Sequence, residues 1–280
     1  MPRSSGNRKS RRRQLQASHQ KNWLTGRYAI LETLRAGKWP VAELFVAAAE
    51  FAEEAAESTQ IEQLAAAANV QIRYETSERI SELCHSTHHQ GVAARMGDFP
   101  YCSVDWLLDS SQKAAAERRT PIANKLDPPT LIVVCDRIQD SHNFGAILRC
   151  CDAMNVKAVV IGDSEQATVT PQVSRSSAGA VNHVPIILTD DLNLFVDGLK
   201  SSGLQIAVAS ETAADPAWTQ ELTMPLVLIV GSEAHGVSDA LLSQCEHHLQ
   251  IPMLGQVESL NVAVATGILL YEIRRQQLGR

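Results

Sequence analysis

The second half of the chain alternates short, continuous apolar runs with longer stretches of helical periodicity, and this alternation limits the fold more than any other feature of the sequence. The apolar runs lie at 131–135, 158–161, 205–209, 226–230 and 248–251, and the helical stretches at 143–154, 192–201 and 259–276. Strands that are apolar at every position are buried on both faces, which requires a mostly parallel sheet between helices. We therefore predict an α/β domain here.

The first half predicts a smaller α/β unit. Apolar residues at Tyr28, Ile30, Leu31 and Leu34, with Gly37 just beyond, have the spacing of a helix with a glycine stop. Strands are expected at 42–47, 70–74 and 92–95, and helices at 59–68 and 77–84. The proline-rich, mixed-charge stretch at 114–130 favours an extended connection. We expect four parts: a disordered basic tail (1–22), a small α/β domain (23–100), a linker (101–129) and a second domain (130–280).

The expected tail concentrates positive charge. It holds seven basic residues and no acidic one. The rest of the chain therefore has a net charge of −13, whereas the whole chain has a net charge of −6. Such a segment lacks the apolar surface to order itself, but it can neutralise phosphates. We interpret it as an RNA-contacting arm. A solubilising terminus or an organellar transit peptide would have a similar composition, whereas a secretory signal would need an apolar stretch after the charges.

Several function classes find no support in the sequence. The apolar runs are far shorter than the roughly 18 residues that a membrane span needs. The six cysteines form no C-x-x-C pair, which suits reduced thiols in a cytoplasm. The histidines at 85, 88 and 89 lie beside Cys84 but lack the further ligands of a zinc site, so we expect no metal and assign them to a solvated turn. Neither a dinucleotide-binding glycine motif nor a P-loop is present.

Three polar, glycine-containing motifs follow expected strands. They read D-R-I-Q-D-S-H-N-F-G-A-I-L-R (136–149), I-V-G-S-E-A-H-G-V (229–237) and I-P-M-L-G-Q-V-E-S-L-N-V-A-V-A (251–265). In open α/β sheets, ligands bind at the carboxyl ends of the strands, where these motifs lie. Each motif alone is weak evidence, because Asn143 and Ser259 could be helix caps.

Taken together, in this order and spacing, the motifs resemble those of the SpoU (TrmH) family of RNA ribose 2′-O-methyltransferases, over about residues 130–276. The segments G-R-Y-A-I-L-E-T-L-R-A-G and H-Q-G-V-A-A of the first domain are similar to the ribosomal-protein-like substrate-binding module of members that methylate a guanosine in 23S rRNA. The resemblance implies a SPOUT methyltransferase domain with a trefoil knot, a homodimer, and a cofactor pocket at the subunit interface.

The resemblance also implies a cofactor and a set of site residues. The cofactor is S-adenosylmethionine, gripped largely by backbone groups, and glycine at 231 would permit its close approach. The residues expected to bind it are Ala209, Ser210, Gly231, Ile251 and Leu260. The residues expected at the catalytic site are Asn143, Arg149, Glu233, Ser259 and Asn261.

Distinct roles are expected within this catalytic set. An arginine keeps its proton at neutral pH, so we expect Arg149 to bind phosphate and stabilise negative charge on the 2′ oxygen rather than act as the base. Glu233 is expected to fix Asn143 or Arg149 through hydrogen bonds. Arg27 and Arg175 are further candidate phosphate contacts.

The leading hypothesis is a guanosine 2′-O-methyltransferase acting on ribosomal RNA, with RNA and a second copy of the chain as partners and no DNA. The same chemistry on transfer RNA, or on a ribosomal RNA site that confers antibiotic resistance, is an alternative. A catalytically silent RNA-binding or ribosome-assembly protein is another, although the presence of Asn143 and Arg149 argues against it.

Overall fold

A computed structural model describes residues 22–47, 55–107 and 129–279, so the basic tail and most of the expected linker lie outside the described residues. The chain divides into two compact units. Unit 1 comprises residues up to Pro100 together with 169–182, and unit 2 comprises 101–168 and 183–280. The sequence placed 169–182 in the second domain. Instead, its helix α8 (Pro171–Ser176) contacts the first strand of unit 1.

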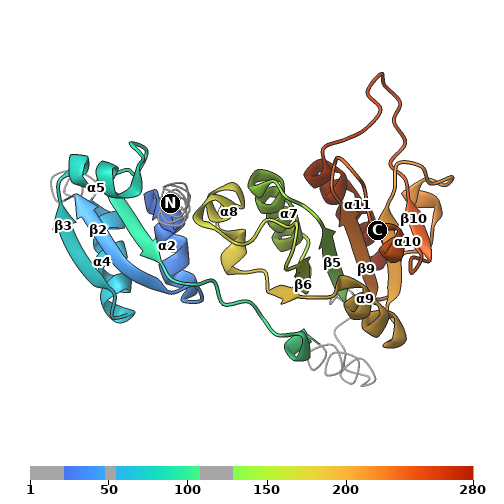
Figure 1. The fold of residues 1–280 in the computed structure, drawn as a ribbon, viewed down its shortest axis with the longest axis horizontal. Coiled ribbons are helices and arrows are strands. Elements are labelled where there is room, and N and C mark those ends of the chain that lie inside the picture. Colours follow the sequence, from blue (N-terminus) through green and yellow to red (C-terminus); the bar gives the residue numbers. More distant parts are fainter. Residues whose placement is uncertain (1–21, 48–54, 108–128, 280) are drawn as a thin grey trace, which may run out of the picture. The chain divides into compact units, whose positions relative to one another are not determined.

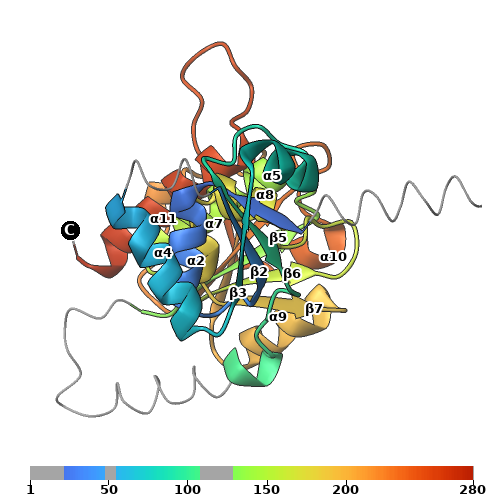
Figure 2. The ribbon, with the colours of Figure 1, turned by 90° about the vertical axis from the view of Figure 1, so that its left-hand side faces the viewer.

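Unit 1 is built on a four-stranded sheet in the order β1-β4-β2-β3. Its strands are β1 (Trp23–Thr25), β2 (Val41–Ala47), β3 (Gln71–Glu75) and β4 (Val92–Met96). β4 runs antiparallel to β1 and β2, and β3 runs parallel to β2. The helices are α2 (Arg27–Ala36), α4 (Ala55–Ala67) and α5 (Ser77–Cys84), and α2 and α4 lie side by side (Figure 2). The expected helices and longer strands are confirmed, whereas β1 was not expected.

Two polar residues of unit 1 are more buried than the sequence suggested. His89 is 3% exposed: its Nδ1 accepts from Gly91 N, so its Nε2 donates to Ser81 Oγ at 2.9 Å. The assignment of this histidine to a solvated turn is therefore wrong. Arg27 is 8% exposed and donates from Nε to Gln90 O at 3.0 Å, which makes it a structural residue of the domain.

Unit 2 is built on a six-stranded sheet in which every pairing is parallel, in the order β10-β8-β9-β5-β6-β7. Its strands are β5 (Leu131–Asp136), β6 (Ala158–Gly162), β7 (Ile186–Thr189), β8 (Gln205–Ala209), β9 (Leu226–Gly231) and β10 (His247–Leu249). The apolar runs form these strands because helices cover both faces of the sheet and bury the strand residues on each side. The prediction of a parallel α/β sheet is confirmed, and β7 is an edge strand that the sequence reading missed.

Helices cover the two faces of this sheet (Figure 1). Alternate residues such as Ile132 and Val134 pack with α9 (Leu192–Ser201) and α10 (Asp239–Leu242) in one buried cluster. Because successive strand residues face opposite sides, Leu131 and Val133 face the other layer. That layer holds α7 (Ser141–Ala153) and α11 (Val262–Gln277), which pack closely against each other. Among the described residues, no helix has the length and apolar character needed to cross a membrane.

The beginning of the expected linker is part of unit 2. Cys102 pairs with Ile187 beside the edge strand β7, and Leu107 is fully buried in the α9 layer of the core. Residues 101–107, which the sequence assigned to the linker, therefore belong to unit 2. Residues 108–128 lie outside the described part of the chain.

Candidate active site

The carboxyl ends of four strands of unit 2 meet at one edge of the sheet. Asp136 at the end of β5 lies in register with Gly231 at the end of β9, and Leu249 of β10 lies in register with Ala209 of β8. All three motifs therefore begin at the same edge, as expected for an open parallel sheet.

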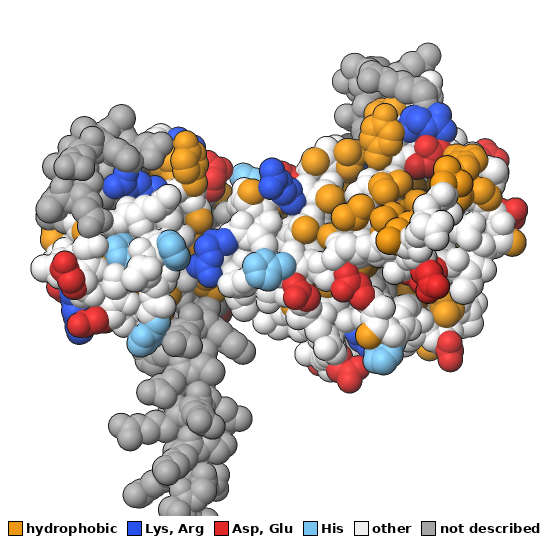
Figure 3. Space-filling model, turned by 90° about the horizontal axis from the view of Figure 1, so that it is seen from above, with side chains coloured by type: hydrophobic (Ala, Val, Ile, Leu, Met, Phe, Trp, Pro, Cys, Tyr) orange, Lys and Arg blue, Asp and Glu red, His pale blue; other side chains and the backbone are white. Residues whose placement is uncertain are grey.

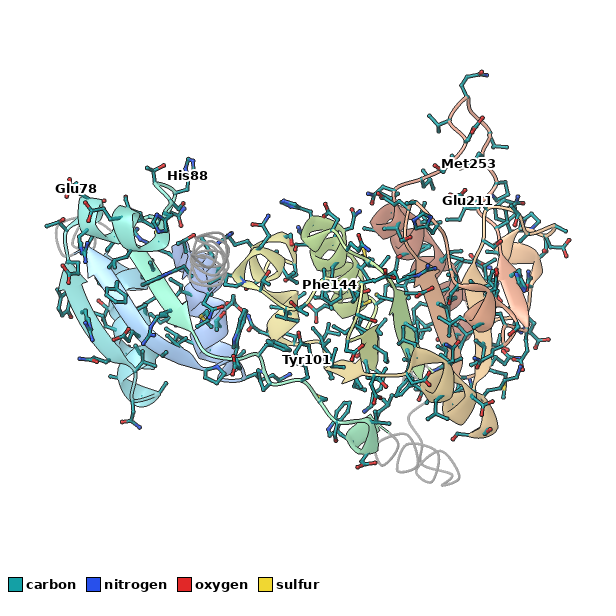
Figure 4. The ribbon with its side chains drawn as sticks, viewed as in Figure 1. Glu78, His88, Tyr101, Phe144, Glu211 and Met253 are labelled. Carbon is teal, nitrogen blue, oxygen red and sulfur yellow. The ribbon has the colours of Figure 1, made fainter. Side chains whose placement is uncertain are left out.

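A cavity of about 560 Å³, here called the first cavity, opens at this edge. It is bounded by the ends of β8, β9 and β10, by the segment between β10 and α11, and by one side of α11. All five residues expected to bind the cofactor line it: Ala209, Ser210, Gly231, Ile251 and Leu260. Two other lining residues, Glu211 and Met253, lie at this same end of unit 2 (Figure 4).

Gly231 is required by a turn of the chain itself. After β9 the backbone folds back through Ser232–Gly236, closed by a 2.8 Å hydrogen bond from Gly236 N to Ser232 O. A Cβ on Gly231 would overlap the carbonyl group of Gly236 and the backbone nitrogen of Val237. The sequence attributed this glycine to close approach of the cofactor, and the structure adds that the backbone of Gly236 also approaches it.

Three expected catalytic residues from three motifs are joined by hydrogen bonds. Asn261 Nδ2 donates to Asn143 Oδ1 at 2.8 Å and to Glu233 Oε1 at 2.7 Å. Asn261 Oδ1 also caps α11 by accepting from the backbone N–H groups of Ala263 and Val264. Glu233 thus holds Asn261, which in turn holds Asn143. Ser259 lines the first cavity beside Glu233.

Replacing Asn261 by aspartate separates its two roles. Aspartate caps a helix as well as asparagine does, so α11 stays formed and the melting temperature stays close to wild type. The new carboxylate, however, would face Glu233 and the Asn143 carbonyl, which are both acceptors. We expect the catalytic rate to fall about 10- to 100-fold. Steady-state kinetics beside thermal unfolding measures both effects, and a wild-type rate in N261D would contradict the role of the trio. N261A, which also loses the cap, should unfold more easily by about 1 kcal/mol.

The start of α7 is capped by Asp140, not by Asn143. Asp140 Oδ1 accepts from the backbone N–H groups of His142 and Asn143, at 2.6 and 3.0 Å. These two bonds hold the pKa of Asp140 below its ordinary value, and the bond from Asn143 N contributes most. Asn143 lies inside the first turn, and its side chain is free to meet Asn261.

Arg149 lies apart from the other expected catalytic residues. It is exposed on α7, six residues beyond Asn143, and lines neither of the cavities described here. Within the described residues it makes no hydrogen bond and no ion pair. The structure of one chain therefore assembles Asn143, Glu233, Ser259 and Asn261 but leaves Arg149 outside the cluster.

A second cavity of about 270 Å³ adjoins the first and shares Ser232, Glu233, His235 and Val262 with it. Arg137 and Glu165 also line it, and neither was singled out from the sequence. Arg137 Nε and Nη2 each lie 3.2 Å from the carboxylate of the buried Asp136, whose Oδ2 accepts from Ser238 N at 2.7 Å. The buried Asp136 carboxylate therefore connects the loop after β5, through Arg137, to the loop after β9, through Ser238. In the part of the chain that the structure describes, no group of three His, Cys, Asp or Glu side chains is placed to hold a metal ion.

Comparison with known families assigns the fold. The profile of the SpoU rRNA methylase family matches residues 130–271, which is more than half of the chain. The chain belongs to this family. A second profile, RNA 2′-O ribose methyltransferase substrate binding, matches residues 23–102. Members of the SpoU family use S-adenosylmethionine as methyl donor.

Similar proteins carry names that agree with this assignment. One from Staphylococcus epidermidis, named as a TrmH family tRNA/rRNA methyltransferase, is 34% identical over 189 residues, covering 68% of this chain and 71% of its own. A Bacillus subtilis protein of the same description is 28% identical, covering 93% of this chain and 98% of its own.

Solved structures show the same fold over nearly the whole chain. An RNA 2′-O ribose methyltransferase matches with a TM-score of 0.68 and 26% identity, covering 95% of this chain and 92% of its own. The SpoU methyltransferase AviRb from Streptomyces viridochromogenes, crystallised with AdoMet, matches with a TM-score of 0.70 and 22% identity, covering 92% and 91%.

Proposed function

We propose that this SpoU-family chain transfers a methyl group from S-adenosylmethionine to the ribose 2′-hydroxyl of a guanosine in large-subunit ribosomal RNA. The observation that carries the proposal is the trio Asn143, Glu233 and Asn261, hydrogen-bonded beside the first cavity and drawn from all three motifs. The substrate-binding profile over residues 23–102 supports an RNA substrate.

The first cavity fits S-adenosylmethionine in size and charge. Its volume lies within the range of small-molecule sites. The lining includes three carboxylates, Glu211, Glu233 and Glu258, and no lysine or arginine. That balance suits a ligand with a sulfonium, an ammonium and one carboxylate, which is net positive. Apolar lining residues such as Leu249 and Ile251 give the adenine a surface to pack on.

When bound, S-adenosylmethionine supplies the reactive methyl group, so the protein has to provide position and electrostatics. Asn143 and Asn261, fixed by Glu233, orient the substrate ribose at the edge of the first cavity. Ser259, which lines the first cavity, helps to orient the substrate. Arg149 binds a substrate phosphate and stabilises the negative charge that develops on the 2′ oxygen, as an electrostatic element and not as the base.

We further propose that the chain has the trefoil knot of its family and works in the cytoplasm, where its six cysteines stay reduced. Burial favours the thiol form and raises the pKa of Cys135 to about 12, which keeps it unreactive. The basic tail, outside the described residues, is proposed to contact RNA phosphates. Unit 1 is proposed to select the RNA.

We also propose a homodimer. The exposed side of α11 is apolar: Val264, Ile268 and Tyr271 are 51%, 43% and 62% exposed. They recur at i, i+4 and i+7, which places them on one face of the helix. Apolar side chains gather on one face of unit 2 (Figure 3). A contiguous exposed apolar surface is typical of an interface.

The variant I268K tests this face. A lysine on each of two facing helices would bring charge into the interface, so we expect a shift from dimer to monomer at micromolar concentration in light scattering after gel filtration. The control is L194K on α9, where Leu194 is 70% exposed on the opposite layer of the sheet. A dimeric I268K protein, or a wild type that is monomeric throughout, would contradict the proposed interface.

Transfer of tritiated methyl groups from S-adenosylmethionine to unmodified ribosomal RNA and transfer RNA tests the function. The expected product is an alkali-resistant, 2′-O-methylated dinucleotide from large-subunit RNA. Labelling of transfer RNA alone would change the proposed substrate to transfer RNA and leave the proposed chemistry as it is. Cofactor binding without labelling of either RNA would contradict the proposed substrate, and absence of cofactor binding as well would favour the silent RNA-binding protein.

A further inference from the structure

The second cavity contains two residues with an unusual backbone. Arg137 has φ 59° and Glu165 has φ 54°, in the left-handed region that residues other than glycine rarely adopt. Such conformations persist only where the surrounding structure enforces them, and they concentrate at functional sites. Both residues line the same cavity.

The two loops that carry these residues are tied together. Gln166 Oε1 accepts from Ile138 N at 2.8 Å, and Ala167 N donates to Ile138 O at 2.8 Å. These bonds join the residues directly after Arg137 to those directly after Glu165. The wall of the second cavity is therefore built in advance of any ligand.

Both side chains keep unused hydrogen-bonding capacity. Arg137 uses Nε and Nη2 on Asp136, and Nη2 also lies 3.3 Å from Gly236 O. Its Nη1 has no partner among the described residues, and the same is true of the exposed Glu165 carboxylate. The cavity thus offers one free donor nitrogen, Nη1 of a fixed guanidinium, and a free bidentate acceptor.

The charges of the cavity decide which part of an RNA it can take. Asp140, Glu165 and Glu233 line it together with the single guanidinium of Arg137. Three carboxylates against one cation repel a phosphate. A neutral base that presents N–H donors to a carboxylate suits this balance.

We infer that the second cavity binds the base of the nucleotide to be methylated and selects guanine, an inference that rests on the proposed function. Arg137 donates to guanine O6, and Glu165 accepts from N1–H and the N2 amino group in parallel. Only guanine has two donors from neighbouring atoms on its Watson–Crick edge. Adenine, cytosine and uracil each offer Glu165 a single donor atom. The target is read as an unstacked base, the usual way in which proteins recognise RNA sequence.

Glycine substitutions test this inference without loss of the fold, because glycine adopts a positive φ at little cost. R137G and E165G remove the side chains, and E165Q keeps the shape but loses the second acceptor oxygen. N155G is the matched control: Asn155 has φ 48° and an exposed side chain in the turn after α7. The readouts are the identity of the labelled 2′-O-methyl nucleoside, kcat/KM on RNA, and the Kd for S-adenosylmethionine.

The wild type should label guanosine. E165G and R137G should lower kcat/KM about 10- to 100-fold, with cofactor Kd unchanged within a factor of about two, and N155G should match the wild type. Inosine at the labelled position, which lacks the N2 group, should lower the wild-type rate but leave the E165G rate as it is. A merely structural Arg137 would instead weaken cofactor binding, because it braces the loop at Gly236.

Two outcomes would overturn the inference while the proposed chemistry stands: labelling of a nucleoside other than guanosine by the wild type, or full activity on guanosine in both glycine variants. If R137G bound S-adenosylmethionine more weakly, by the same factor by which its rate falls, Arg137 would be a structural residue that holds the loop at Gly236 and not a residue that reads the base. Absence of any labelling by the wild type would contradict the proposed function itself, so the two failures are distinguishable.

Discussion

Replacing Arg149 by alanine is expected to lower the rate of methyl transfer about 100- to 1000-fold, because it removes charge stabilisation that the other site residues do not supply. The side chain is exposed, and within the described residues it has no hydrogen bond or ion pair, so its loss leaves no group unsatisfied. Stability should therefore change by less than about 0.5 kcal/mol. Methyl incorporation, cofactor Kd and thermal unfolding are measured together.

Two companion variants make this result interpretable. R149K keeps the charge but loses the planar fork that pairs with phosphate, so an intermediate rate is expected. K157A removes one positive charge elsewhere in unit 2, near the far end of α7, and should keep the wild-type rate. An R149A protein with more than half of the wild-type rate would assign the 2′-oxygen chemistry to other groups.

Alanine at Gly231 is expected to abolish cofactor binding, because the new methyl group would overlap the backbone of Gly236 and force the turn after β9 to open. Overpacking against backbone costs about 1–3 kcal/mol or more, which corresponds to several degrees of melting temperature in a chain of this size. Calorimetric titration with S-adenosylmethionine and thermal unfolding measure the two losses.

Gly255 provides the matched control for this variant. It lies in the segment between β10 and α11, with no atom within 4 Å of an added Cβ. G255A should therefore bind cofactor as the wild type does. Retained cofactor affinity in G231A, or equal losses in both variants, would show that the turn does not shape the first cavity.

The strands of unit 2 could be predicted because burial on both faces leaves a direct mark on the sequence. Leu131–Asp136 is apolar almost throughout and fully buried along its length. β7 was missed because the short run Ile186–Thr189 follows a proline and lies at a sheet edge. α8 was missed because its serine-rich sequence has no apolar periodicity, and its position within unit 1 depends on contacts distant in sequence.

The candidate site could be predicted where residue type and position at a strand end point to the same chemistry, as at Asn143, Glu233 and Asn261. The hydrogen bonds that connect these three residues could not be predicted from the sequence. The bonds of Asn261 span 118 and 28 residues, and its second role as a helix cap depends on where α11 begins, three residues later than expected. The left-handed backbone of Arg137 and Glu165 was also unpredictable, since the residues typical of that region are glycine and asparagine.

Helix α11 has a consequence for the energetics of the proposed homodimer. Val262, Ala265 and Leu269 form part of the wall of the first cavity, while Val264, Ile268 and Tyr271 project on another face of the same sixteen-residue helix. In the proposed homodimer, a ligand that orders one face of this helix would also order the other, so cofactor affinity and self-association would be thermodynamically linked. By reciprocity, dilution that separates the proposed pair would weaken cofactor binding by the same factor by which the cofactor strengthens the pair. In that case the apparent affinity for S-adenosylmethionine would rise with the concentration of the protein itself.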